Sequence, residues 1–314
     1  MARFDVTVVG ELNLDLILYG LPDDLEPEKE LLAGDLALTL GSSSAIFAHN
    51  LAIIGNRVGF ISRVGTDPLG KIALERLESG GVDVSHVRSV AGQAMTGLTV
   101  IVTGTRNRRI LTYPGAMFEM GYEDLDLDYL RSSGHFHLSS FYLHRALRPR
   151  IAELFERMKR AGLGTSLDTN DDPDDTWEGL DELLPLVDVL FVNEREACRI
   201  TRENNLEAAV GKLAGEASVV VIKLGRRGAR VRRGQQEWTH AGYPVNAVDP
   251  VGAGDSFDAG FLHQYVRGAD LQACLASGNR AGAFSTTRPG GTEAFRERMK
   301  WQEFLQQHGN EAAA

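Results

Sequence analysis

The sequence has very little cysteine, no long apolar run and no excess of positive charge. Its 314 residues include two cysteines, Cys198 and Cys274, which stand too far apart to suggest a disulfide framework or a zinc site. A membrane-spanning helix needs about 18 consecutive apolar residues, and no such stretch occurs. The opening residues MARFDVTVVG hold only a short apolar stretch, interrupted by Asp5, which does not fit a signal peptide. These absences predict a protein of the reducing cytoplasm.

Acidic residues outnumber basic ones. The chain has 43 Asp and Glu against 33 Lys and Arg, which gives a formal net charge of −10. An acidic surface disfavours broad contact with nucleic acid or anionic membranes, so neither is expected as a partner. A local anion site stays compatible with this charge, because backbone amides bind phosphate whatever the net charge.

Short β-branched runs alternate with helical patterns and predict an α/β fold. Strands are expected at 4–9, 58–62, 165–168, 187–192 and 219–224. The best helical pattern covers 150–161, with apolar residues at helical spacing at Ile151, Leu154, Phe155 and Met158. A helix followed closely by a strand indicates βαβ units, and hence a mostly parallel sheet flanked by helices. Ligands of such sheets bind at the carboxyl ends of the strands.

Two segments interrupt this alternation. Residues 12–40 are extended and acidic, and residues 95–115 hold two β-rich runs around a polar turn. Together they predict a small β-rich lid on the large domain, although an edge hairpin with a surface loop fits the pattern equally well. The turn carries Arg106, Arg108 and Arg109, which favour a solvated turn over contacts with an acidic or phosphorylated acceptor.

The most informative stretch is DPVGAGD at 249–255, where a glycine-rich turn opens a helix. Aromatic residues follow it at a spacing of four, namely Phe257, Phe261 and Tyr265. Small residues let the backbone approach a ligand closely, and the free amides of a first helical turn bind anions. The amides expected to do so belong to Gly252, Ala253 and Gly254.

Asp255 falls in the first turn of this helix, beside the expected anion site. An Asp at such a position is most often a helix-capping residue, and that interpretation stays open. A carboxylate next to an anion site also meets the needs of phosphoryl transfer, because it accepts the proton of an attacking hydroxyl while fixed dipoles hold the phosphoryl charge. We therefore interpret Asp255 as a candidate general base.

Two further patterns point away from other chemistries. The segment GTDPLGK at 65–71 fits a phosphate-binding P-loop until Ile72, where Ser or Thr is needed. His135 and His137 share one face of an expected strand, which is a spacing that can bind a metal. No third ligand is evident, so a structural role is favoured.

DPVGAGD and six further segments resemble the PfkB, or ribokinase-like, family of carbohydrate kinases. They are GELNLD at 10–15, LGSSSA at 40–45, VGTDPLG at 64–70, NERE at 193–196, KLGRRG at 223–228 and TRPG at 287–290. The resemblance implies a ribokinase-like fold, ATP as donor, Mg²⁺, often a monovalent cation such as K⁺, and a lid that also serves in homodimerisation. It makes residues 1–310 one kinase domain with the lid inserted within it.

The acceptor side combines a strand pattern with this resemblance. Polar and apolar residues alternate over 11–16 and place Asn13 and Asp15 on one strand face, from which they would grip sugar hydroxyls. A solvated strand face is the alternative. The resemblance favours sugar binding and adds the glycine loop Gly41, Ser42 and Ser43. Ile46 and Leu143 stand where ribokinases carry polar sugar contacts, which puts ribose itself in doubt.

The resemblance also implies a nucleotide and metal side. Its nucleotide-binding residues are Asn193, Lys223, Gly225, Gly228 and Asn279. Glu196 would hold Mg²⁺ through water; helix capping by the Asn193–Glu196 pair and a simply solvated Lys223 are the alternatives. A monovalent cation would take the side chain of Asp249 and the carbonyls of Val251, Ser285, Arg288 and Gly290, although Ala294 lacks the hydroxyl that completes this shell.

Together these observations predict an ATP-dependent kinase that phosphorylates a hydroxymethyl group of a sugar or sugar derivative. A nucleoside acceptor is the first alternative, since Phe141 and Tyr142 are candidate purine contacts. A sugar- and nucleotide-binding sensor without catalysis is the second.

Overall fold

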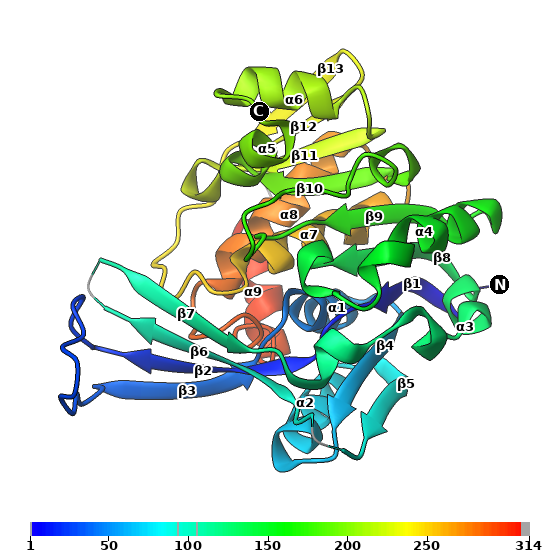
Figure 1. The fold of residues 1–314 in the computed structure, drawn as a ribbon. Helices are drawn as coiled ribbons and strands as arrows, with labels where there is room; N and C mark the ends of the chain where they lie inside the picture. Colours follow the sequence, from blue (N-terminus) through cyan, green and yellow to red (C-terminus); the bar gives the residue numbers. More distant parts are fainter. Residues whose placement is uncertain (1, 93, 105, 309–314) are drawn as a thin grey trace.

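The computed structural model describes residues 2–92, 94–104 and 106–308, so the ends of the predicted 1–310 span lie outside the described residues. A nine-stranded sheet runs through the molecule in the order β13-β12-β11-β10-β9-β8-β1-β4-β5 (Figure 1). Its strands are β1 (Phe4–Val9), β4 (Val58–Gly65), β5 (Asp83–Val90), β8 (Ser133–Ser139), β9 (Gly164–Asp168), β10 (Val189–Asn193), β11 (Val219–Lys223), β12 (Ala229–Arg233) and β13 (Gln236–His240). Neighbours from β11 to β5 pair in parallel, and β12 and β13 add an antiparallel edge. The mostly parallel α/β fold predicted from the sequence is confirmed.

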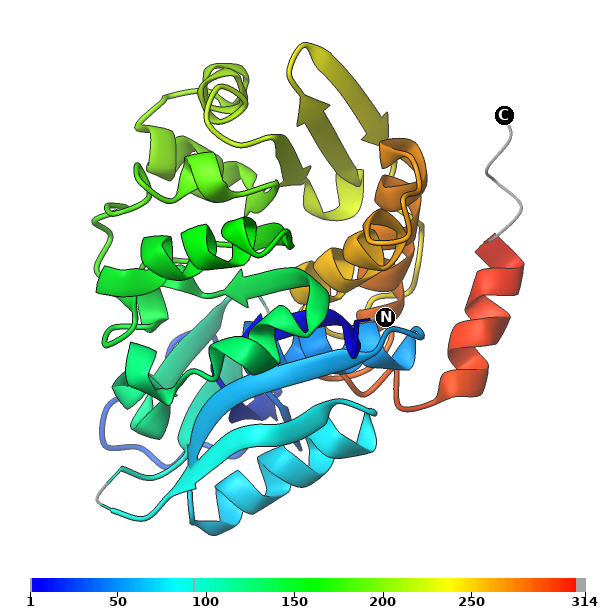
Figure 2. The same cartoon turned by 90° about the vertical axis from the view of Figure 1, so that its right-hand side faces the viewer.

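Helices cover both faces of this sheet (Figure 2). One layer contains α3 (Leu127–Arg131), α4 (Ile151–Arg160), α5 (Glu194–Thr201) and α6 (Leu206–Leu213). The other contains α1 (Ser43–Ile53), α2 (Pro68–Ser79), α7 (Ala253–Tyr265) and α8 (Leu271–Ser285), and α9 (Arg298–His308) packs on α8. No helix in these described residues is long and apolar enough to cross a membrane.

Strand β10 illustrates why the chain folds into these layers. Leu190 and Val192 pack against the helices on one face, and Val189 and Phe191 pack against those on the other. Because both faces are buried, the strand is a continuous apolar run rather than an alternating one. Helix α4 shows the complementary pattern: the four apolar residues at helical spacing are all buried beneath it.

The two segments predicted to form a lid build a separate four-stranded sheet, which we call the lid sheet. Its strands are β2 (Asn13–Tyr19), β3 (Asp35–Leu40), β6 (Gly97–Thr103) and β7 (Arg108–Tyr113), in the order β3-β2-β6-β7. In Figure 1 it extends from the main body at the lower left. The alternative of an edge hairpin with a surface loop is wrong, because β2 and β6 pair in parallel across distant parts of the sequence.

Polar residues gather where the parallel strands end. Asp168, Asn193 and Lys223 are the last residues of β9, β10 and β11, and Glu11 follows β1. Helix α7 begins beside them, since Asp258 on this helix contacts Lys223. The fold therefore brings the charged residues to the carboxyl edge of the sheet, where ligands of open α/β sheets bind.

Candidate active site

The DPVGAGD turn opens α7 as the sequence predicts. Gly252 is the N-cap with a φ of 72°, and a Cβ there would lie 2.4 Å from Gly291 Cα, so both the conformation and the space require glycine. The Ala253 amide donates to Pro250 O at 3.2 Å. That bond corrects one expectation: the Ala253 amide is occupied inside the turn, which leaves the amides of Gly252 and Gly254 as the better candidates for an anion.

Asp255 lies in the first turn of α7 and is partly exposed. Burial raises the pKa of its carboxyl to about 7, and the Asp168 charge adds to the rise, while Lys223 and a hydrogen bond from Ser43 oppose it. A carboxyl with this pKa is poised to exchange a proton near neutral pH. The structure thus places an acid of suitable proton affinity beside the glycine turn.

Lys223 forms a buried charge cluster beneath this turn. Its ammonium lies 2.8 Å from Asp168 Oδ2 and 3.0 Å from Asp258 Oδ2, and a Cβ on Gly254 would lie 3.4 Å from it. The alternative of a solvated Lys223 is therefore wrong. Burial and the neighbouring Asp168 raise the pKa of Asp258, whereas the Lys223 charge holds the pKa of Asp168 below its usual value.

On the acceptor side, Asn13 and Ser42 bind each other. The Ser42 hydroxyl donates to Asn13 Oδ1 at 2.7 Å, and the backbone N–H of Asn13 donates to Ser42 Oγ at 2.8 Å. The side-chain Nδ2 of Asn13 donates to Thr99 Oγ1 at 3.1 Å. Gly41 leaves room for this arrangement, because a Cβ there would lie 2.2 Å from Asp15 Oδ1. The predicted acceptor residues are thus brought together, with Asn13 and Ser42 holding the shape and Asp15 offering carboxylate oxygens.

The carboxyl group of Asp15 also has a raised pKa. Asp15 is 6% exposed, and burial raises the pKa of its carboxyl to about 7, with further contributions from Asp255, Asp249 and Glu11. The hydrogen bond from Thr99 acts in the opposite direction. Asp255 on α7 is therefore near enough to the lid sheet for its charge to act on the carboxyl group of Asp15.

Asn193 and Glu196 form a capping box at the start of α5. The backbone N–H of Asn193 donates to Glu196 Oε2 at 2.8 Å, and the backbone N–H of Glu196 donates to Asn193 Oδ1 at 2.9 Å. Burial raises the pKa of Glu196 to about 7, Asp168 adds to the rise and Lys223 opposes it. Each carboxylate oxygen keeps a lone pair, so the pair fits a water-bound Mg²⁺ as well as a cap. Within the described part of the chain, no group of three acids, histidines or cysteines is arranged to hold a metal by itself.

The loop after β11 has two glycines with different surroundings. Gly225 has a φ of 60° and open space around its Cα, whereas a Cβ on Gly228 would lie 2.0 Å from His240 O. Asn279 fixes the same segment, since its Nδ2 donates to His240 O at 3.0 Å and to Ala241 O at 3.3 Å. The loop is thus shaped by Gly228 and Asn279 and leaves Gly225 accessible to a ligand.

Asp249 organises the loop expected to hold a monovalent cation. Its Oδ1 accepts the Val251 amide at 2.9 Å, and its Oδ2 accepts the Gly290 amide at 3.0 Å and the Tyr19 hydroxyl at 2.6 Å. Ser285 is buried nearby, at the end of α8, and the Thr286 carbonyl accepts the Asp249 amide at 3.1 Å. The segments of Val251, Ser285, Arg288 and Gly290 therefore converge, and Asp249 keeps one oxygen with a single donor.

The lid sheet reaches the glycine turn before α7 in this structure. Ile17 and Ile101 pack against Val251, beside the bond from Tyr19 to Asp249. Arg106 pairs with Asp23 at 3.1 Å, as expected for a solvated turn. The register places Arg109 opposite Val102, on the face of the lid sheet that points away from Asp15.

The two histidines have the structural role that the sequence favours. The Ser166 hydroxyl bridges His135 Nε2 and His137 Nδ1 at 2.8 Å each, and His137 Nε2 lies 2.8 Å from Ser139 Oγ. Burial lowers the pKa of His135 to about 4 and that of His137 to about 3. Both rings are therefore neutral and hydrogen-bonded in the interior.

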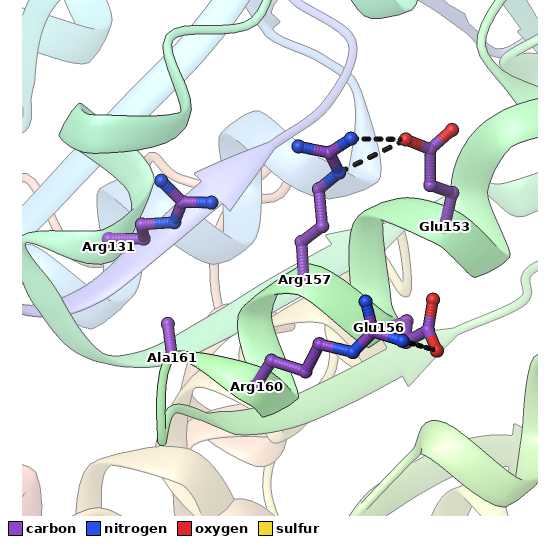
Figure 3. Close-up of a pocket in the computed structure, with 6 residues that line it drawn as sticks. All are labelled: Arg131, Glu153, Glu156, Arg157, Arg160 and Ala161. Carbon is purple, nitrogen blue, oxygen red and sulfur yellow. Dashed lines mark hydrogen bonds and ion pairs between the residues drawn. The ribbon is translucent and has the colours of Figure 1, made fainter.

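A charged hollow of 620 Å³ lies elsewhere on the molecule (Figure 3). Arg131 and Ala161 line it just before β8 and β9 begin, so it belongs to the amino edge of the sheet. Figure 3 shows Arg157 turned to Glu153 and Arg160 to Glu156, each within α4. Its arginines already have partners, and the hollow is separate from the glycine turn before α7.

Three buried acids close to Asp255 or Lys223 escaped the sequence prediction: Glu11, Asp168 and Asp258. Asp168 ends a buried parallel strand, and Asp258 interrupts an apolar helix between Phe257 and Phe261, and both features are readable signals. Their common partner, Lys223, is 55 and 35 residues away from them, which no local pattern reveals.

Comparison with known proteins agrees with this geometry. Residues 3–298 match the family described as pfkB family carbohydrate kinase. The chain is 32% identical to an ATP-dependent ribose-1-phosphate kinase of Halopiger xanaduensis over 81% of this chain and 82% of that protein, and 27% identical to the ribokinase of Haemophilus influenzae over 97% and 99%.

Solved structures share the fold. Arabidopsis thaliana ribokinase complexed with ribose and ATP aligns with a TM-score of 0.81 and 26% identity, covering 97% of this chain and 99% of that one. A ribokinase II from E. coli in complex with ATP and Mg²⁺ aligns with a TM-score of 0.82 and 24% identity over the same shares. The chain is an ATP-dependent carbohydrate kinase and belongs to the pfkB family.

Proposed function

We propose that this kinase transfers the γ-phosphoryl group of ATP to a hydroxymethyl oxygen of a sugar or sugar derivative, with Asp255 as the general base. One observation carries the proposal: burial raises the pKa of Asp255 to about 7 at the start of α7, beside the amides of a glycine turn. A base with a pKa near the working pH combines adequate ionisation with adequate proton affinity. The same turn supplies donors for the phosphoryl charge.

The residues act in a simple order. Asp15 holds the acceptor, Asp255 accepts the proton of the attacking hydroxyl, and the amides of Gly252 and Gly254 stabilise the charge on the transferred group. Mg²⁺, when bound through water near Glu196 and the phosphates, neutralises phosphate charge. Gly225, Gly228 and Asn279 shape the nucleotide loop, and Lys223 acts from beneath the turn. Contact of the lid sheet with Val251 excludes water that would otherwise hydrolyse ATP.

The charge around the acceptor space favours an uncharged acceptor. The charged groups that contribute most to the raised pKa of Asp15 are acids, namely Asp255, Asp249 and Glu11. The buried cation nearby, Lys223, is committed to two carboxylates. A phosphate or carboxylate on the acceptor would meet repulsion there, so we expect neutral sugars to be phosphorylated faster than their phosphates.

The nucleoside alternative loses its sequence support. Phe141 and Tyr142 are each 2% exposed, and the Tyr142 ring packs edge-on against Trp177, so neither can stack on a purine. A sensor without catalysis would bind sugar and ATP without forming product. The acceptor assay below separates these cases.

The testing experiment is an ATP–Mg²⁺ assay of neutral sugars, sugar phosphates, sugar acids and nucleosides, with Asp255→Asn beside wild type. Replacing a general base lowers turnover by about 10²–10⁴-fold, and we expect a fall in that range. Asp128→Asn, an exposed acid on α3, is the matched control and should leave turnover unchanged. Wild-type turnover in Asp255→Asn would refute the base, and product formed only from nucleosides would refute the acceptor class.

A monovalent cation fits the loop that Asp249 organises. The segments of Val251, Ser285, Arg288 and Gly290 meet there, and backbone carbonyls suit a large, weakly hydrated ion. We expect K⁺ to raise turnover, and to raise the thermal midpoint of the protein without nucleotide, relative to an equal concentration of tetramethylammonium. Equal values in both salts would contradict the site.

The outer face of the lid sheet fits a second copy of the chain. One apolar row, Leu38, Leu16, Val100 and Leu111, crosses all four strands on the face away from Asp15. Leu111 is 60% exposed, which favours burial in a homodimer. We expect wild type to sediment as a dimer, Leu111→Asp as a monomer, and Leu32→Asp, in the exposed β2–β3 loop, as a dimer. A monomeric wild type would contradict the interface.

A further inference from the structure

Glu11 is a buried carboxyl group in the short linker between β1 of the main sheet and β2 of the lid sheet. It is 2% exposed, and an acid buried this far is costly unless its oxygens receive hydrogen bonds. Its Oε2 accepts the Ser44 hydroxyl at 2.6 Å, and its Oε1 accepts the Ser140 hydroxyl at 2.7 Å. A Cβ on Gly10 would lie 1.9 Å from Ser44 Oγ, so the preceding glycine is needed for this contact.

The ring of His144 lies near Glu11, but it hydrogen-bonds a different partner. His144 Nε2 lies 3.6 Å from Glu11 Oε2 but 3.0 Å from the Ser139 carbonyl, to which it donates. Burial lowers the pKa of His144, which keeps the ring neutral. The carboxyl group is therefore held by hydroxyl groups from two turns rather than by a salt bridge.

Both turns contact the surroundings of Asp255. Ser43, the neighbour of Ser44 in the first turn of α1, lies close enough to Asp255 to lower the pKa of its carboxyl group. The Ser140 amide donates to the Asp168 carbonyl at 2.9 Å, and the Ser140 hydroxyl accepts from Asn170 Nδ2 at 3.4 Å. Glu11 thus links the start of the lid sheet to the turns of Ser44 and Ser140, which lie near Asp255.

We propose that Glu11 is a positioning residue for phosphoryl transfer, which fixes the linker of the lid sheet against the turns beside Asp255. This rests on the proposed role of Asp255 as base. Rigid placement matters because a small displacement of reacting groups costs much of the rate, and Glu11 spans the parts that must stay in register.

The charge of Glu11 also acts on the base. The charged groups around Asp255 are Glu11 in the linker, Asp15 on β2, Asp168 on β9, Lys223 on β11 and Asp258 on α7 itself. Glu11 is one of the acids that raise the pKa of Asp255. Removing its charge lowers that pKa, so the acidic limb of kcat/KM against pH moves to lower pH. A residue that served only to hold the fold would not move that limb.

The experiment compares Glu11→Gln and Ser44→Ala with wild type and with the exposed Glu303→Gln as control, using the best acceptor and ATP–Mg²⁺. Glu11→Gln should lower kcat by about tenfold or more, as displaced reacting groups do, with its acidic limb moved to lower pH. The KM for ATP should stay within about twofold, because ground-state nucleotide binding is not altered. Ser44→Ala keeps the charge, so it should lower kcat without moving the limb.

Wild-type kcat in Glu11→Gln, or a fall in kcat with an unmoved limb, would overturn the proposal. If Glu11→Gln does not fold, wild-type kcat in Ser44→Ala overturns it instead. Asp255→Asn is measured in the same series: should that variant keep its activity, the proposed function fails whatever the Glu11 variants show. The two failures are therefore distinguishable.

Discussion

Replacing Lys223 by Met tests the buried charge balance beneath the glycine turn before α7. Met keeps the reach of the side chain and removes the ammonium, which lies 2.8 Å from Asp168 Oδ2 and 3.0 Å from Asp258 Oδ2. Both carboxyl groups are 1% exposed, so water cannot replace the lost partner. Breaking a buried ion pair from one side costs about 3–5 kcal/mol in free energy of unfolding, and we expect a loss in this range.

The loss should grow as the pH rises. Burial alone would raise the pKa of Asp168, but Lys223 and the hydrogen bonds outweigh it and depress that pKa. In the wild type Asp168 therefore adds stability above its unfolded pKa of about 3.9, and this is lost as the pH falls through the folded value. Without Lys223 the pKa of Asp168 rises above its unfolded value, and ionising the buried acid then costs stability at neutral pH.

Urea unfolding at about pH 5 and about pH 8 measures this difference directly. Lys71→Met is the matched control, because that side chain is 78% exposed. Its free energy of unfolding should stay within about 0.5 kcal/mol of wild type. Wild-type stability of Lys223→Met at the higher pH, or an equal deficit at both pH values, would refute the reasoning.

Two further substitutions probe the acceptor side. Gly41→Ala places a Cβ 2.2 Å from Asp15 Oδ1 and should raise the acceptor KM by about tenfold or more, with the KM for ATP unchanged. Gly211→Ala, in open space on α6, is its control, and equal acceptor KM values would count against the proposed pocket. Tyr19→Phe removes the 2.6 Å bond to Asp249 and should raise ADP release without acceptor, because the lid sheet seals less well. Equal ADP release in wild type would show that this bond does not hold the lid sheet closed.

The sequence predicts the parts of the fold that depend on local pattern. The apolar strands and the helix over 150–161 follow from periodicity, and the turn at Gly252 follows from the need for small residues where a helix opens. The sequence predicts the lid sheet less firmly, because the parallel pairing of β2 with β6 joins residues 84 positions apart, as in Asn13 with Gly97. Local pattern could not choose between a separate sheet and a hairpin.

The sequence predicts candidate site residues better than it predicts the hydrogen bonds and ion pairs between them. Asp255 follows the glycine turn directly in the sequence, so we expect the two to lie close together from the sequence alone. The bond from Ser140 to Glu11 joins residues 129 positions apart, and Lys223 meets its two acids only because β9 and β11 end, and α7 begins, at one edge of the sheet. The use of the Ala253 amide inside its own turn depends on backbone geometry that residue types do not specify.

The dependence of kcat/KM on pH in wild type and in Asp255→Asn tests the central claim most directly. Because burial raises the pKa of Asp255 to about 7, wild type should lose activity as the pH falls through that region and the base takes up a proton. The variant should lack this limb and show a uniformly low rate. An acidic limb of the same shape in Asp255→Asn, or a wild-type rate in that variant, would contradict the account.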